Sequence, residues 1–124
     1  MPSNEYKDAN KLTINAYITN DRLEDLMVCC FEGGSNYWIK EVIIEKGRGL
    51  YDFVYDGNIT LKIKVVGDSE IYELDKFKLL KGLSKMTESR IQYKKFQRLI
   101  NVGEDAIDTD VMLQMALFGE IVYG

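Results

Sequence analysis

Alternation of apolar and polar residues predicts most strands of this chain, because successive side chains of a strand point to opposite faces of a sheet. The clearest case runs from Ile59 to Val65, and the same pattern extends over Lys11 to Ile18. A tight turn after Val65 leads to a further strand over Glu70 to Leu74. Tyr37 to Glu45 is instead apolar on both faces and rich in aromatic and β-branched residues. We therefore expect that strand to lie in the centre of the sheet.

Helical spacing of apolar residues follows the first predicted strand. Asp21 and Glu24 have the form of a capping box, and the apolar side chains that follow fall on one face: Leu23, Leu26, Met27 and Cys30. Gly33 is expected to end this helix in the left-handed conformation. Gly34-Ser35-Asn36 then turns the chain into the next strand.

Three more helices are predicted after residue 75. Asp75 can cap the first, whose inner stripe is expected to consist of Phe77, Leu80, Leu83 and Met86. Ser89 can cap the second, in which the stripe consists of Phe96, Leu99 and Ile100. Val111 to Phe118 is apolar nearly all round and should form a buried helix, with Asp108 or Thr109 as its cap.

Together these elements predict an α+β fold in one domain over residues 1–124. The expected architecture is a mostly antiparallel four- to five-stranded sheet, with one helix after strand one and a C-terminal helical cluster. A chain of this length can bury a single core. No stretch is apolar enough for a membrane span, and the first residues lack the basic and apolar regions of a signal peptide, so we expect a cytoplasmic protein.

Charge is divided unevenly along the chain, although the net charge is only −4. Residues 76–98 carry eight basic side chains against Glu88, a balance of +7, whereas the remainder carries eight basic and 19 acidic side chains, a balance of −11. Cations interleaved with Phe77, Tyr93 and Phe96 are typical of a surface that meets phosphates and bases. Two amphipathic helices with solvated cationic faces would give the same pattern. The overall pI near 4.9 argues against general DNA binding.

The chain contains no histidine, which removes the commonest general base and the Ser/His and Cys/His nucleophilic pairs. The carboxylates of residues 104–110 lie close enough in sequence to suggest a cation site. Acidic groups also complement the start of the helix that follows, and we favour that role. Of the neighbouring Cys29 and Cys30, we assign Cys30 to the core. No catalytic residue, metal ligand or cofactor is predicted, and we do not expect an enzyme.

Five residues form the predicted ligand-binding set. Asn36, Tyr37 and Trp38 follow the Gly-Gly turn and stand side by side at the mouth of a strand. An asparagine amide can read the edge of a base, and a tyrosine or tryptophan ring can stack on its face. Arg90 and Lys94, in the basic segment, are expected to hold phosphate. The alternative for Trp38, the only tryptophan, is a place in the core.

Two segments of the chain resemble a known family. Phe31 to Trp38, in which Glu-Gly-Gly runs into Tyr-Trp, and Ala116 to Gly124, which begins Ala-Leu-Phe-Gly-Glu, are similar to small accessory proteins of tailed phages and prophages of Gram-positive bacteria. A Leu-x-Lys-Phe-like segment at Leu74 to Leu79 fits the same family, whereas Cys29-Cys30 and the basic stretch from Tyr93 to Arg98 depart from it. The resemblance implies a phage origin and the host cytoplasm, and it brings no established activity.

These features lead to a first hypothesis: a phage counter-defence protein that sequesters a nucleotide-type immune signal, such as a small anionic cyclic nucleotide, without catalysis. The apolar residues Ile121 to Tyr123 are expected either to complete the sheet or to meet another subunit in a homo-oligomer. The alternative is a protein-directed role, as an inhibitor of a host defence complex, as a nucleic-acid mimic, or as a subunit of a phage assembly. Hydrolysis of a nucleotide by carboxylates and a divalent cation is a third, less favoured reading.

Overall fold

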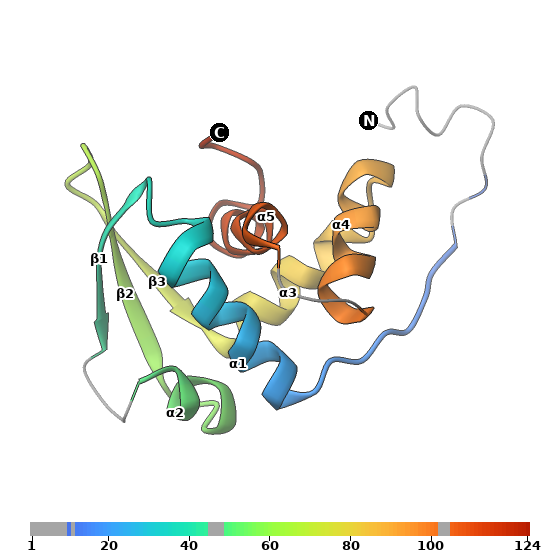
Figure 1. The fold of residues 1–124 in the computed structure, drawn as a ribbon, viewed down its shortest axis with the longest axis horizontal. Coiled ribbons are helices and arrows are strands. Elements are labelled where there is room, and N and C mark those ends of the chain that lie inside the picture. The colour runs from blue at the N-terminus through green and yellow to red at the C-terminus, as the bar shows by residue number, and fades with distance from the viewer. Residues whose placement is uncertain (1–9, 11, 45–48, 102–104) are drawn as a thin grey trace.

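The computed structural model describes residue 10 and residues 12–44, 49–101 and 105–124. A small sheet stands at one end of the molecule, and the helices gather around α5 (Figure 1). The helical elements are α1 (Asn20–Cys29), the π-helical turn η2 (Cys30–Gly34), α2 (Leu50–Tyr55), α3 (Lys76–Met86), α4 (Arg90–Asn101) and α5 (Ala106–Phe118). The strands are β1 (Ile39–Ile44), β2 (Thr60–Val65) and β3 (Ile71–Asp75).

The sheet of the described residues has three antiparallel strands in the order β1-β2-β3, so the prediction of four to five strands is wrong. The alternation from Ile59 to Val65 is confirmed as β2, whose apolar residues are buried. The strand expected at the centre is instead the edge strand β1. A bulge between Ile39 and Glu41 shifts its register, which brings Ile39 and Val42 to the same face. Its apolar pattern therefore reflects the bulge and not burial on both faces.

The segment before α1 accounts for the missing strand. Its described residues, 12–19, are extended but belong to no sheet, while Lys11 of the predicted strand lies outside the described residues. The segment runs along the helical end of the molecule, away from β1 and β3 (Figure 1), and Leu12 and Tyr17 are 79% and 89% exposed. The alternation of apolar and polar residues is typical of a strand, but among the described residues no strand lies beside this segment to pair with it. Thr19, not the predicted Asp21, caps α1 by accepting from the amide of Arg22.

The two glycines after α1 have different roles from those predicted. Gly33 does not take the left-handed conformation, because α1 continues through η2 before the chain turns at Ser35. At Gly34, a Cβ atom would lie 2.4 Å from the carbonyl oxygen of Ala106. Only glycine fits that position, since η2 packs directly on the backbone of α5.

Helix α3 is confirmed with Asp75 as its cap, but half of its predicted inner face is wrong. Leu83 and Met86 are buried as expected, whereas Phe77 and Leu80 are exposed. The buried face instead centres on Gly82, where a Cβ atom would lie 2.6 Å from the backbone of Ala116. This close approach to α5 turns Leu79 inward in place of Leu80, so the tightest helix contact sets the face.

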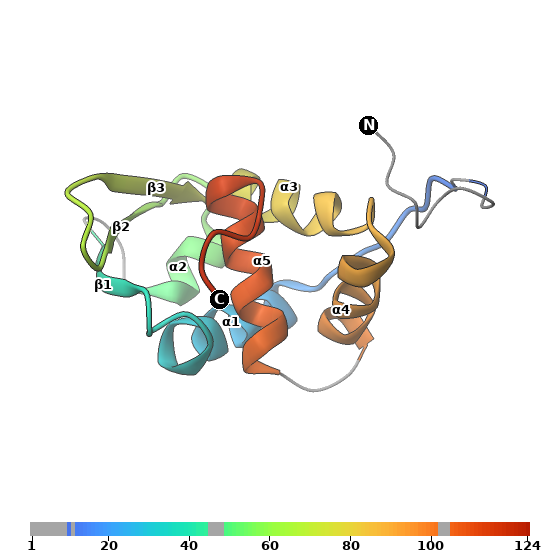
Figure 2. The same cartoon turned by 90° about the horizontal axis from the view of Figure 1, so that it is seen from above.

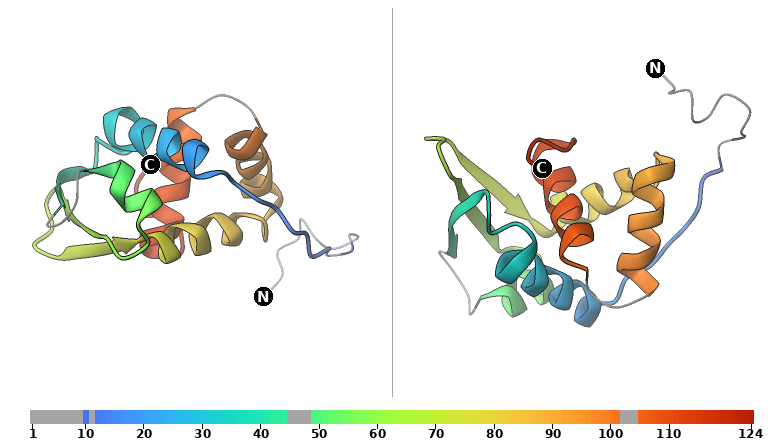
Figure 3. Two further views of the ribbon diagram at one scale, coloured as in Figure 1. Left: turned by 90° about the horizontal axis from the view of Figure 1, so that it is seen from below. Right: turned by 45° about the horizontal axis from the view of Figure 1, so that its top comes forward.

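Helix α5 runs through the middle of the helical end, with α1 and η2 on one side and α4 on the other (Figure 3). It starts earlier than predicted: Asp105, not Asp108 or Thr109, caps it by accepting from the amides of Ile107 and Asp108. Val111 to Gln114 are buried as expected, whereas Met115 to Phe118 are only half-buried, and the buried stretch also includes the polar residues Asp108 to Asp110. In the part of the chain described, no helix combines the length and apolarity needed to cross a membrane.

Candidate functional site

A hollow of about 640 Å³ opens where η2, α4, α5 and the C-terminal residues meet. We call it the Tyr37 hollow; it is lined by Gly33, Gly34, Tyr37, Ile91, Gln92, Lys95, Ala106, Ile107, Asp110, Val111, Gln114, Ile121, Tyr123 and Gly124. Helices α1 and α4 lie on opposite sides of α5, and the last residues of the chain run back alongside α5 (Figure 2). The site therefore joins parts of the chain that are far apart in sequence.

Asp110 forms the polar floor of the Tyr37 hollow. Its Oδ1 accepts from the Ser35 hydroxyl and from the Trp38 indole N–H, each at 2.7 Å. Its Oδ2 accepts from the Tyr37 hydroxyl at 2.7 Å and from the Gln114 amide at 3.2 Å. A carboxylate that is only 8% exposed needs such donors to offset its lost hydration. Asp110 thereby ties the turn before β1 to α5.

Gln114 extends this network to the C-terminal residues. Its Oε1 accepts from the amides of Val122 and Tyr123, both at 2.8 Å, and its Nε2 donates to the Tyr123 carbonyl at 3.0 Å. The fully buried amide thus acts like a neighbouring strand for the returning chain. The Tyr123 ring stacks on Trp38 with 5.1 Å between centroids and 6° between planes. Tyr123 therefore covers a face of the indole ring.

The side chains of the three adjacent residues predicted to bind a ligand lie in three different environments. Tyr37 is 53% exposed and lines the hollow. Trp38 is 2% exposed, which confirms the core alternative, and its ring is covered by Tyr123 and Phe118. Asn36 is exposed, donates to the Glu32 carbonyl and is not part of the hollow's lining. Of the three, only Tyr37 is positioned to stack on a ligand in this hollow.

Arg90 and Lys94 line a neighbouring hollow of about 620 Å³ along α4, together with Ile91, Tyr93, Lys95, Gln97 and Arg98. Ile91 and Lys95, one helical turn apart, line both hollows. Lys95, which the sequence analysis did not select, is therefore the cation that shares a hollow with Tyr37. We call the surface of Arg90, Lys94 and Lys95 the cationic face of α4.

Arg98 is engaged in holding α4 to α5. Its Nε and Nη2 donate to the two carboxylate oxygens of Asp108 at 2.7 and 2.8 Å. This paired contact raises the pKa of Arg98 above its ordinary value, since the hydrogen bonds favour the charged guanidinium. The Arg98–Asp108 pair therefore fixes the cationic face of α4 relative to the Tyr37 hollow.

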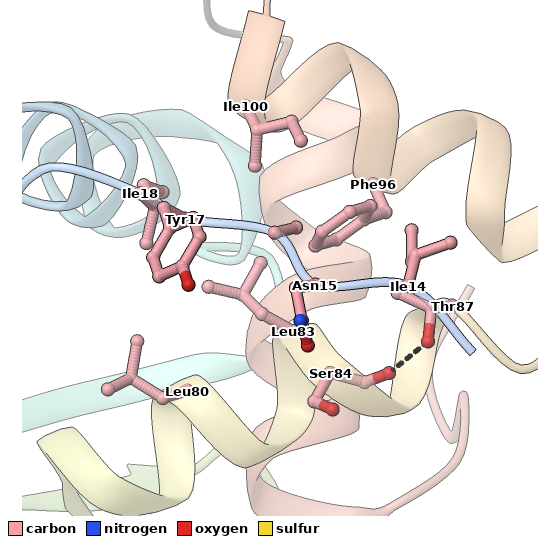
Figure 4. A pocket seen from close by; sticks show the side chains of 11 residues that line it. Ile14, Asn15, Tyr17, Ile18, Leu80, Leu83, Ser84, Thr87, Phe96 and Ile100 are labelled. Atoms are coloured by element: carbon pink, nitrogen blue, oxygen red, sulfur yellow. Dashed lines mark hydrogen bonds between the residues drawn. The ribbon is translucent and has the colours of Figure 1, made fainter.

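A third hollow, of about 440 Å³, lies where residues 14–18 pass over α3 and α4. Figure 4 shows Leu80 and Leu83 from α3 and Phe96 from α4 around the passing segment. No charged side chain is among the residues that line it. Residues 14–18 themselves form one wall of this hollow, so it is a groove between the N-terminal segment and helices α3 and α4.

In the described part of the acidic run 104–110, the carboxylates make structural contacts. Asp105 caps α5, Asp108 pairs with Arg98, and Asp110 forms the floor, while Glu104 lies outside the described residues. Among the residues described, no group of three or more potential ligands is close enough to hold a metal ion.

Two titratable groups at or near the hollow have raised pKa values. Burial and the hydrogen bond to Asp110 raise the pKa of Tyr37 to about 12, so its hydroxyl stays a donor at neutral pH. Burial raises the pKa of the Cys30 thiol to about 12 as well, which leaves it a poor nucleophile. Both oxygens of Asp110 already accept hydrogen bonds. Tyr37 and Cys30 are therefore both held in their neutral forms at neutral pH.

Comparison with known proteins gives no match to a family model, to a curated protein or to a solved structure.

Proposed function

We propose that this chain is a non-catalytic binding protein that takes a nucleotide-type ligand in the Tyr37 hollow. The observation that supports the proposal is the position of Lys95, which lines both this hollow and the cationic hollow of α4. A half-exposed aromatic ring and a cation thereby share one hollow of about 640 Å³. A ring that stacks on a base and a cation that meets phosphate are the two parts of nucleotide recognition.

The arrangement of groups suggests which part of the ligand lies where. Tyr37 is anchored through its hydroxyl to Asp110, which fixes the ring and lowers the entropy lost when a base stacks on it. Phosphate would lie toward the cationic face of α4, next to Lys95. Arg90 and Lys94 keep their predicted role in this arrangement, as cations at its outer end.

The biological role that fits this binding is capture of a signal. A phage protein that sequesters a nucleotide-type immune signal in the host cytoplasm acts by stoichiometry and needs no catalytic side chain. The support for this setting is the family resemblance at Phe31 to Trp38 and at Ala116 to Gly124. Sequestration also agrees with raised pKa values at Tyr37 and Cys30, which leave neither group reactive at neutral pH.

Calorimetry with a panel of mononucleotides, cyclic dinucleotides and cyclic ADP-ribose isomers tests the proposal. We expect micromolar or tighter binding to one ligand class, weakened about tenfold or more by Tyr37→Leu and by Lys95→Ala. Tyr37→Phe, which keeps the ring, should bind better than Tyr37→Leu.

Matched controls are available in the same chain. Tyr51 is as exposed as Tyr37 but lies on α2, and Lys81 is an exposed lysine of α3 outside the hollow. Tyr51→Leu and Lys81→Ala should therefore leave affinity unchanged. Absence of binding across the whole panel at micromolar protein would overturn the proposal.

A protein-directed role is the second candidate, because apolar side chains crowd the rim of the hollow. Ile91, Ile107 and Ile121 line it and are 64%, 68% and 40% exposed, and Val122 beside them is 52% exposed. An apolar patch bordered by cations is typical of a surface that meets a protein, either a host defence component or a second copy in a homo-oligomer.

Two variants distinguish a protein partner from a small ligand. Ile107→Glu and Val122→Glu place charge on the apolar rim, whereas Lys81→Glu is a control outside it. If the protein-directed role holds, tagged wild-type protein should retain a defined partner in affinity purification, and both rim variants should lose it. Retention of a small molecule with no protein partner would count against this role. Light scattering of the same samples reports whether the partner is a second copy.

A further inference from the structure

Helix α3 and the N-terminal segment expose large apolar side chains at one surface. Phe77 and Leu80 are 75% and 40% exposed, and they share a face of α3 because they lie three residues apart. Tyr17 is 89% exposed and lines the same groove as Leu80. The side chains of Tyr17 and Leu80 face each other across this groove (Figure 4). Large apolar side chains that gather at one place, unlike single scattered ones, indicate a surface that meets a partner.

The groove between residues 14–18 and helices α3 and α4 is itself apolar. It has a volume of about 440 Å³, and its lining includes Leu83, Phe96 and Ile100 but no charged side chain. Protein interfaces gain much of their binding energy where an apolar side chain of one partner fills a pocket of the other. The groove therefore has the form of a receptor for an apolar side chain, and a flat lipid surface cannot fill it.

Lysines border this apolar surface. Helix α3 contains no acidic residue and four lysines, Lys76, Lys78, Lys81 and Lys85. Lys81 is exposed and lies one turn from Phe77 on the same face. Residues 76–98 have a charge balance of +7, whereas the remainder of the chain has a balance of −11. An acidic partner is therefore attracted to this side of the protein and repelled by the rest.

We propose that Tyr17, Phe77, Leu80 and Lys81 form a docking surface for an acidic segment of another protein. An apolar side chain of that segment enters the groove, and its carboxylates meet the lysines of α3. Nucleic acid is also anionic, but its phosphates offer nothing that fills an uncharged apolar groove. This α3 docking surface is separate from the nucleotide site, since none of its four residues lines the Tyr37 hollow.

A random peptide library displayed on phage is the probe that tests the proposal. We expect the peptides selected by the wild-type protein to combine large apolar residues with Asp or Glu. The most frequent peptide, made synthetically, should bind Leu80→Glu and Lys81→Glu about tenfold more weakly than wild type, or less. Fluorescence anisotropy measures these affinities, and the affinity for wild type should fall as salt is added.

The rim of the Tyr37 hollow supplies matched controls. Ile107→Glu and Val122→Glu place the same charge at exposed apolar positions outside the α3 docking surface, so both should keep the wild-type affinity for the peptide. Leu80 and Lys81 are exposed, so their variants should unfold at temperatures close to that of wild type. Thermal unfolding thereby separates a loss of docking from a loss of fold.

Several outcomes would overturn the proposal. One is a selection that enriches no peptide or peptides without acidic residues, and another is a peptide that binds wild type, Leu80→Glu and Lys81→Glu equally. Binding of wild type to phosphatidylserine vesicles that Leu80→Glu abolishes, with no peptide selected, would assign the surface to lipid. Self-association of wild type in light scattering that Leu80→Glu abolishes would assign it to a second copy of this chain. None of these results bears on nucleotide binding in the Tyr37 hollow.

Discussion

The two walls of the Tyr37 hollow use their polar side chains in opposite ways. On α5, Asp110 accepts from four donors and Gln114 holds the returning chain through both amide atoms. On α4, Gln92 keeps a buried acceptor without a partner in the described chain, and Lys95 lines the same hollow. A network of satisfied hydrogen bonds makes one geometry rigid, whereas a buried acceptor without a partner costs stability. The comparison teaches that the α5 wall holds the hollow together, whereas the α4 wall contributes the cation that lines it.

The largest effect on stability is expected at Asp110, which forms the floor of the Tyr37 hollow. Asp110→Ala leaves the Ser35, Tyr37 and Trp38 donors without their acceptor, and the free energy of unfolding should fall by about 3 kcal/mol or more. Urea denaturation measures this change. Asp25→Ala, at an exposed position of α1, should change stability by less than about 0.5 kcal/mol. A loss below about 1 kcal/mol for Asp110→Ala would show that the network does not build the hollow.

Adjacent glycines give a matched pair with the next largest effect. A Cβ atom at Gly34 would meet the Ala106 carbonyl oxygen at 2.4 Å and the Thr109 hydroxyl at 2.7 Å, whereas at Gly33 it would meet nothing within 4 Å. Gly34→Ala should lower the free energy of unfolding by about 1–3 kcal/mol, because η2 must move away from α5. Gly33→Ala should be close to neutral. Equal stabilities of the two variants in thermal unfolding would contradict the close packing of η2 on α5.

The raised pKa of Tyr37 predicts a smaller, pH-dependent effect on stability. Its folded pKa is raised from 10.0 to about 12, so folding favours the protonated hydroxyl. That stabilisation is fully present below pH 10 and is lost as pH rises toward 12. Because Tyr37 is half exposed, the effect should stay below about 1 kcal/mol. Between pH 9 and 11, the unfolding temperature should fall more steeply with pH for wild type than for Tyr37→Phe. Parallel curves for the two proteins would refute the assignment. Tyr51→Phe is the control and should behave like wild type.

The smallest stability effect is expected on the α4 wall. Lys95→Ala should change the free energy of unfolding by less than about 0.5 kcal/mol, even though it is expected to weaken ligand binding. Thermal unfolding with and without the bound nucleotide measures both properties in one series. A large loss of stability without ligand would show that Lys95 belongs to the framework, and the contrast between the walls would then fail.

The sequence revealed the helices better than it revealed the site. Asp75 and the apolar run to Phe118 lead directly to α3 and α5, because caps and helical spacing are local properties. Asp110 was interpreted only as part of an acidic run, since its donors Ser35 and Trp38 are 75 and 72 residues away. A sequence signal for Gln114 did exist: it is the one polar side chain within the apolar stretch from Val111 to Phe118. A buried amide in such a helix requires partners, and here they are the returning chain.

The sequence does not single out Lys95, for a different reason. The sequence predicts the basic segment, but it does not show which of its cations lie on the face of α4 that meets α5. Ile91 and Lys95 share a face because they are one turn apart, and that face is directed at the hollow. Sequence alone gives the spacing of such residues and not the direction in which the face points.

What the sequence determined by itself is the set of periodic elements: β2, α3 and α5 follow from alternation, spacing and caps within short stretches. Tertiary structure alone decided that β1 is an edge strand, that residues 12–18 pair with no strand of the described sheet, and that Leu79 faces inward on α3 in place of Leu80. The physical reason is that a period depends on neighbours along the chain, whereas pairing and burial depend on neighbours in space. The Tyr37 hollow belongs to the second kind, because Asp110 and Gln114 acquire their roles only when α5 meets residues 35–38 and the returning chain.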